Sequence, residues 1–325
     1  MKKKEKSRII APEKGIRKTV GRPLASFSVM WCYVNIPFRP RSVRAFLAYI
    51  RTVIRDFFAL QFLAKYHVGG IKKIPVVRVD HSLDQTIPFL PHKIKIYMHF
   101  VNFWIEPMSM LIRRYGAHNA MPFCSEWLRV ITKAYEEAAR MYRFRMSTMA
   151  RPAYYKGQFL TIHLFDPHLL CVPSLHIAIV VLCSSFYRHF FEREQFSEAE
   201  KQQWNAELYA GAVAIAESVL YVKQHSVNCV PAALYMVSHL FPDLFTPTDA
   251  VAFIGELFQQ PEGMSDECAQ AVRTHILDMY ERLLLEGAHD DDWRTPVQRW
   301  IVAYERENPP EAQQDNPHET RIFLD

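Results

Sequence analysis

The sequence predicts an all-α fold, a multi-helix bundle with an acidic helical extension at its C-terminal end. Half of the 325 residues are hydrophobic, which is enough for a large buried core. Only 10 glycines and an aromatic content of 13% argue against a turn-rich β protein and against disorder. The long apolar and amphipathic segments described below are therefore interpreted as helices.

Charge divides the chain into parts. Residues 1–23 hold nine Lys and Arg against two Glu, whereas residues 255–325 hold six Arg and no Lys against sixteen Asp and Glu. We expect a basic N-terminal tail over 1–23, a helical core over 24–245, an acidic helical extension over 246–306 and a polar tail over 307–325. No nucleic-acid partner is expected, because no recognition motif accompanies the basic residues.

The elements follow in order from local patterns. After the turn-rich "PFRPRSVR", residues 43–66 form a long amphipathic pattern, and residues 67–91 are rich in turn residues and predict a loop. In the extension, a buried stripe at helical spacing predicts a packed cap; its members are Val272, His275, Ile276, Met279 and Leu283. The remaining helices are expected near 93–115, 123–146, 170–190, 196–222, 226–241, 247–260, 264–287 and 291–306.

Several segments are candidates for spanning a membrane, which takes about 20 apolar residues. Residues 167–187 contain no Asp, Glu, Lys or Arg, and residues 97–112, 206–222 and 226–241 are weaker candidates. The mean hydropathy of −0.11 is low for repeated spans, although polar groups could face the bundle interior. We expect a multi-pass membrane protein with a cytosolic N-terminus, its basic tail either following the positive-inside rule, resting on anionic lipid or simply solvated.

The cysteines suggest packed, reduced thiols. The sequence has no C-x-x-C pair and no short Cys/His cluster, so neither a zinc site nor a disulfide framework is predicted. The six cysteines are Cys32, Cys124, Cys171, Cys183, Cys229 and Cys268.

Two histidine-containing stretches carry the chemistry. In "CVPSLHIAIVVL", Pro173 stands where a helix would begin, so the backbone N–H groups of residues 174–176 could hold an anion beside His176. In "SVLYVKQHSVNCV", Ser218, His225 and Cys229 would share one face of a continuous helix. Either histidine alone could equally be a satisfied core residue.

Together these stretches resemble a known family. "PSLH" at 173–176 and "S-x-L-x-x-K-Q-H" at 218–225 look like the second and third signatures of the type 2 phosphatidic acid phosphatase superfamily, in its inositol phosphorylceramide synthase-like branch. "LDQTIPFLPHKIKIY" at 83–97 and "MSTMARP" at 146–152 are similar to earlier pieces of that pattern. The resemblance covers about residues 83–235.

The resemblance implies a helical bundle that acts on lipid phosphates without a metal or other cofactor. His225 would accept the phosphoryl group as a phosphohistidine, and His176 would protonate the leaving alcohol. Cys229 stands where the family has an acid that orients the nucleophile, and a thiol is a poorer acceptor than a carboxylate. The residues that the resemblance implies for phosphate binding are Arg151, Ser174, Lys223 and Ser218.

Two hypotheses about function remain from the sequence. The first is a membrane-associated phosphatase or phosphotransferase that acts on a lipid phosphate, with membrane lipids as its surroundings. The second is a catalytically impaired relative that binds lipid or serves as a scaffold. Cys229, which stands at the position of the family's acid, suggests this second hypothesis. A soluble phosphatase is a third hypothesis, because the mean hydropathy is low.

Overall fold

The computed structural model describes residues 10–66 and 74–309. Within these ranges the chain is mostly helical, so the predicted all-α class is confirmed. The predictions for residues 1–9, for the start of the loop and for most of the polar tail lie outside the described residues. Two short strands, β1 (Val76–Arg78) and β2 (Met146–Thr148), form the sheet.

Thirteen helices are described by the structure within 10–66 and 74–309, besides short 3-10 turns. They are α1 (Glu13–Arg17), α2 (Met30–Asn35), α3 (Val43–Thr52), α4 (Leu60–Tyr66), α5 (Ile94–Tyr115), α6 (Ala117–Phe144), α7 (Gln158–Phe165), α8 (Leu175–Arg193), α9 (Glu198–Tyr221), α10 (Cys229–Leu240), α11 (Pro247–Glu256), α12 (Asp266–Glu286) and α13 (Arg294–Glu307).

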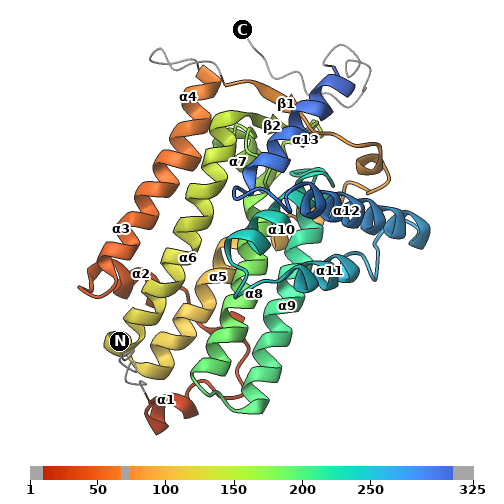
Figure 1. Cartoon of the computed structure of the whole chain (residues 1–325). Helices are drawn as coiled ribbons and strands as arrows, with labels where there is room; N and C mark the ends of the chain where they lie inside the picture. Colours follow the sequence, from red (N-terminus) through yellow and green to blue (C-terminus); the bar gives the residue numbers. More distant parts are fainter. Residues whose placement is uncertain (1–9, 67–73, 310–325) are drawn as a thin grey trace.

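Helices α5, α6, α8 and α9 run alongside one another in the body of the molecule (Figure 1), and α8 packs against the other three and against α10. Residues 177–183 of α8 are completely or almost completely buried. A helix that is apolar on all sides is stable only when it is covered on all sides. The start of α8, which carries His176, is therefore held firmly by its neighbours.

The predicted amphipathic helix over 43–66 is present and lies along α6 at the edge of the molecule (Figure 1). A π-helical stretch, η3 (Val53–Ala59), joins α3 to α4. Its buried acid, Asp56, forms ion pairs with Arg55 and with Arg143 of α6. These contacts fix one side of the long helix against the bundle and leave its opposite side exposed.

The C-terminal helices pack onto the bundle. Helix α12 lies against α10, and four members of the predicted stripe are buried: Val272, Ile276, Met279 and Leu283. The hydroxyl of Tyr280 donates to Ser238 Oγ of α10 at 3.1 Å. The acidic extension therefore shares the core with the helices that precede it.

The parallel strands β1 and β2 pair Val76 with Met146, and Leu170 continues the pairing beside Ser147. This sheet explains two differences from the predicted helices. Helix α6 ends at Phe144 because the chain enters β2, and the helix expected from 170 begins only at Leu175 because residues before it pair with β2. The sheet thus places two irregular segments, after β2 and before α8, side by side.

Two further predictions about helices differ from the structure. Helix α7 was not predicted and follows Gly157, which has a left-handed φ of 60°. No helix within residues 10–66 and 74–309 combines the length and the apolar character needed to cross a membrane. The best candidate, 167–187, is divided by the irregular residues before α8.

Candidate functional site

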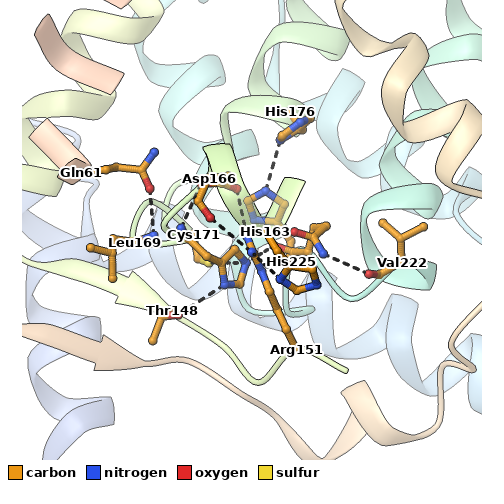
Figure 2. Close-up of polar contacts among 12 residues, drawn as sticks. Gln61, Thr148, Arg151, His163, Asp166, Leu169, Cys171, His176, Val222 and His225 are labelled. Carbon is orange, nitrogen blue, oxygen red and sulfur yellow. Dashed lines mark hydrogen bonds and ion pairs between the residues drawn. The ribbon is translucent and has the colours of Figure 1, made fainter. Parts of the chain in front are cut away.

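The fold brings the two histidines of the signature stretches into contact. Nε2 of His225 lies 3.3 Å from Nδ1 of His176, although the residues are 49 positions apart. The ring centroids are 5.4 Å apart, and Figure 2 shows the imidazoles directed toward each other. The pairing that the two motifs predict is therefore present.

His176 occupies the first turn of α8. Ser174 is the N-cap, and its Oγ accepts from the N–H of Ile177 at 3.4 Å. Pro173 thus precedes the cap instead of lying in the first helical turn as predicted. Its carbonyl accepts a hydrogen bond of 2.6 Å from the hydroxyl of Tyr142, which anchors the start of α8 to α6.

An aromatic enclosure surrounds the His176 imidazole. Tyr97 and Phe100 of α5 lie against it, with ring centroids 4.8 and 4.5 Å away. Burial and, to a smaller extent, the neighbouring His225 together lower the pKa of His176 to about 3. His176 is consequently neutral near pH 7 in the ligand-free protein.

His225 lies in a turn between α9 and α10, in the gap between the helices predicted over 196–222 and 226–241, so Ser218, His225 and Cys229 do not share the face of one continuous helix. Helix α9 ends in a Schellman arrangement: Lys223 N–H donates to the Leu220 carbonyl, and Gln224 N–H donates to the Val219 carbonyl. Lys223 takes the left-handed φ of 55° that this ending requires. The turn, rather than a helix face, directs the imidazole toward α8.

Lys223 and Ser218 do not join the histidine pair. The amine of Lys223 donates to the carbonyls of Asp84 and Ile87, and burial lowers its pKa to about 8 against the opposing effect of Asp84. Ser218 Oγ donates to the Ile215 carbonyl at 2.7 Å inside α9. Their predicted phosphate-binding roles thus have no counterpart in this arrangement.

Arg151 lies after β2 and pairs with an acid that the sequence analysis missed. Its Nη2 is 3.0 Å from Asp166 Oδ2, its Nη1 donates to the Asp166 carbonyl at 3.3 Å, and Nη1 lies 3.5 Å from His163 Nδ1. Burial raises the pKa of Asp166, but Arg151 and His168 outweigh it, so the pKa is lowered overall. Figure 2 shows this group beside the histidine pair.

Two cysteines complete the surroundings of His225. The sulfurs of Cys171 and Cys229 and a ring nitrogen of His225 lie within 4.8 Å of one another, and all three residues are buried. Burial raises the pKa of Cys171, but hydrogen bonding from Cys229 and the presence of His168 hold it well below its usual value. Burial and the Cys171 sulfur raise the pKa of Cys229.

His168 connects these parts. Its Nε2–H donates to the Gln224 carbonyl at 2.7 Å, since a carbonyl can only accept, and the same nitrogen lies 3.4 Å from Cys171 Sγ. Nδ1 then accepts from Thr148 Oγ1 at 3.3 Å. This tautomer ties the turn that carries His225 to β2 and to the segment before α8.

The sequence analysis found no metal-ligand cluster because it considered short spacings only. Within residues 10–66 and 74–309, the structure has one group of His, Cys, Asp or Glu side chains with ligand atoms close enough for a metal ion, namely Cys171, His225 and Cys229. Cys171 and Cys229 are separated in sequence by the whole of α8 and α9. No local pattern could therefore have joined them.

The arrangement offers one imidazole that could act as a nucleophile, a second imidazole in contact with it that could transfer a proton, and the guanidinium of Arg151 in the same group of side chains. These groups suit the transfer of an anionic group such as phosphoryl. Comparisons with protein-family models, with curated proteins and with solved structures find no match to this chain.

Proposed function

We propose that this protein is a phosphatase or phosphotransferase that acts on a lipid phosphate through a phosphohistidine at His225. The observation that carries the proposal is the 3.3 Å contact between Nε2 of His225 and Nδ1 of His176. It joins the two motifs whose resemblance to the lipid phosphate phosphatases suggests this chemistry. A nucleophile and a proton donor must face a common point for such a displacement.

In the first step, the lone pair on Nε2 of His225 attacks phosphorus, a P–N bond forms, and the bond from phosphorus to the lipid oxygen breaks. His176 supplies the proton that the departing alkoxide needs. In the second step, the oxygen of water or of an alcohol attacks phosphorus, the P–N bond breaks with its electron pair returning to Nε2 of His225, and the attacking oxygen gives its proton to His176. The two rings must separate to admit the phosphoryl group between them.

His176 can serve as an acid only when substrate is bound. Its pKa of about 3 in the ligand-free protein reflects burial and the adjacent His225. A dianionic phosphate placed beside the ring favours the imidazolium and raises that pKa. Substrate binding would therefore favour protonation of His176.

Arg151 and the N-terminus of α8 would stabilise the phosphoryl oxygens. Arg151 already holds one anion, the carboxylate of Asp166, at 3.0 Å. A phosphate would share the guanidinium, whose planar donors suit phosphate oxygens. Ser174 caps α8, and the backbone N–H groups that follow it are a further anion-binding element.

Association with a membrane surface is supported by the exposed side of the long outer helix. Apolar side chains and arginines alternate along it at helical spacing, as in helices that lie at a lipid interface. Arginines near anionic lipid contribute about 1 kcal/mol each. The exposed apolar residues on this helix include Leu47, Ile54 and Phe58, and its exposed arginines include Arg44, Arg51 and Arg55; Phe38 and Arg41, just before the helix, are also exposed.

The test uses full-length protein purified in detergent and measures phosphate release from phosphatidic acid and from polyprenyl and sphingoid phosphates. A substrate labelled in its phosphate should transfer label to the wild-type protein as an acid-labile phosphohistidine. His225→Asn should abolish both label and release. His176→Asn should reduce turnover by about 10²–10⁴-fold, the usual contribution of a general acid.

His189→Asn is the matched control, because His189 is an exposed histidine on the same helix as His176. It should retain full activity. Phosphate release that persists in a folded His225→Asn variant would exclude the proposed intermediate.

The second candidate is a catalytically impaired relative that binds lipid phosphates. The observation that favours it is the ion pair between Arg151 and Asp166, which occupies the guanidinium in the ligand-free state, together with Cys229 in place of an acid. This candidate predicts that wild-type protein sediments with vesicles containing phosphatidic acid but releases no phosphate from any of the lipids tested.

A further inference from the structure

The cluster of Cys171, His225 and Cys229 has the composition of a soft-metal site. One ligand comes from the segment before α8, one from the turn after α9, and one from the first residue of α10. Their ligand atoms lie within 4.8 Å of one another. Tetrahedral coordination with Zn–S bonds of about 2.3 Å sets sulfur atoms roughly 3.8 Å apart, so only a small contraction is needed.

An unsatisfied atom points to a ligand at this position. Nδ1 of His225 is buried and has no hydrogen-bond partner among the described residues, while Nε2 contacts His176. The exposed fraction of His225 is 6%, so solvent does not readily satisfy this nitrogen. A buried polar atom without a partner destabilises the folded state, and a bound metal ion would give this nitrogen a partner.

We propose that Cys171, Cys229 and Nδ1 of His225 bind Zn²⁺. Two thiolates and a neutral imidazole balance the charge of the dication, which suits a buried site. Each thiol releases its proton to solvent when the ion binds. Three protein ligands leave a fourth tetrahedral position for water or another small ligand.

His168 supports this site from outside the ligand set. Its Nε2–H lies 3.4 Å from Cys171 Sγ and also donates to the Gln224 carbonyl. Because this nitrogen carries a proton, it is not itself a ligand. A donor to a metal-bound sulfur orients it, and loss of such an outer partner typically weakens metal binding 10–100-fold.

Zinc at this position would inhibit the proposed phosphoryl transfer. This inhibition rests on the proposed function, whereas the proposal that zinc binds here does not. A neutral imidazole coordinated through Nδ1 carries its proton on Nε2. Nε2 then has no lone pair with which to attack phosphorus. Zinc would therefore act as an inhibitor that competes for the nucleophile.

The test titrates metal-free, reduced full-length protein with Co²⁺ and then with Zn²⁺. Cobalt at a Cys₂His site should show sulfur-to-metal charge-transfer absorption and the strong visible bands of tetrahedral coordination, at one ion per chain. Zinc should displace it. Cys171→Ser and Cys229→Ser should each lose the charge-transfer bands or weaken binding at least tenfold, whereas Cys268→Ser, at a cysteine on α12 outside the cluster, should bind as the wild type does.

A second measurement covers variants that do not fold. In wild-type protein, Zn²⁺ should protect Cys171 and Cys229 from alkylation, read by mass spectrometry, and leave Cys268 reactive. The proposal would be overturned if the wild-type protein showed neither charge transfer nor protection, or if both serine variants bound the metal as tightly as the wild type does. His176→Asn separates the two functions, because it should reduce turnover by about 10²–10⁴-fold while zinc binding remains.

Discussion

At the scale of single residues, the site depends on what surrounds Nδ1 of His225. In the family that the motifs resemble, a carboxylate follows the nucleophilic histidine by four positions, and here that position is Cys229. The structure adds Cys171 beside it. Two sulfurs therefore lie beside His225, and sulfur is a weaker hydrogen-bond acceptor and a better metal ligand than a carboxylate is for a soft metal.

The difference between Cys229 and the carboxylate of the family pattern leads to a prediction for Cys229→Asp. A carboxylate at position 229 should hold the imidazole with its proton on Nδ1 and raise phosphate release at least tenfold, since losing such a partner costs orders of magnitude in other enzymes. Cys229→Asn, which has a similar shape and no charge, is the control and should not produce the gain. Equal rates for the two variants would show that a charge at this position does not assist His225.

A second residue-scale prediction concerns His275. Its Nε2–H donates to Asn228 Oδ1 at 2.8 Å, and its ring stacks on His81 with centroids 4.0 Å apart. Burial lowers the pKa of His275 to about 4 from 6.5, His81 adds to that effect, and Asp278 opposes it. His275 therefore takes up a proton near pH 6.5 in the unfolded chain, but only near pH 4 in the folded chain.

The free energy of unfolding should consequently fall as the pH falls from about 6.5 to about 4. His275→Gln, which keeps a donor for Asn228, should make this dependence shallower. Urea denaturation at a series of pH values measures it. The slope should not vanish, because burial also lowers the pKa of His81. An unchanged slope in the variant would contradict the assignment.

At the scale of elements, the turn between α9 and α10 decides where His225 lies. Lys223 adopts a left-handed conformation that is uncommon for a residue with a side chain. Its amine donates to the carbonyls of Asp84 and Ile87, which ties the turn to the segment before α5. The lysine of the signature therefore stabilises the turn in this structure.

Lys223→Gly and Lys223→Ala separate these two contributions. Both variants lose the two hydrogen bonds from the amine, and both should be less stable than the wild type. Glycine adopts a positive φ without strain, so Lys223→Gly should be about 1 kcal/mol more stable than Lys223→Ala. Thermal or chemical denaturation measures the difference. The opposite order would mean that the turn changes conformation in the variants.

At the scale of the whole molecule, one hydrophobic core extends from the N-terminal helices to α13. The acidic extension takes part in it: α12 packs on α10, and Tyr304 of α13 donates to the carbonyl of Asp80. The extension thus reinforces the segment that precedes the site. The long outer helix remains with one side exposed.

The exposed side of the long outer helix (43–66) leads to a prediction about binding to lipid vesicles. The double variant Leu47→Glu and Phe58→Glu should reduce sedimentation with vesicles that contain phosphatidic acid at least tenfold, because it removes apolar contacts and adds repulsion from anionic headgroups. Leu285→Glu is the control, since Leu285 is exposed on α12, far along the chain from this surface. Equal loss with both variants would indicate non-specific hydrophobic attachment.

Much of the fold could be predicted from local patterns. The helical periodicity located most of the longer helices to within a few residues. Helices α1, α2 and α7 were not predicted, α6 begins at Ala117 instead of near 123, and two helix ends depend on the sheet. The motifs identified His176, His225 and Arg151, and the contact of the two histidines followed from them. The resemblance also suggested phosphate-binding roles for Lys223 and Ser218, whose side chains instead donate to backbone carbonyls of the fold.

The sequence by itself determined the helical class and the two short motifs that contain His176 and His225, because periodicity and short motifs are local features. Only the tertiary structure decided that Cys171 and Asp166 belong to the same site and that Lys223 serves the turn. Their partners lie in other segments, and which distant segments meet depends on how the helices pack. Packing depends on the whole chain, so no short stretch of the sequence determines it.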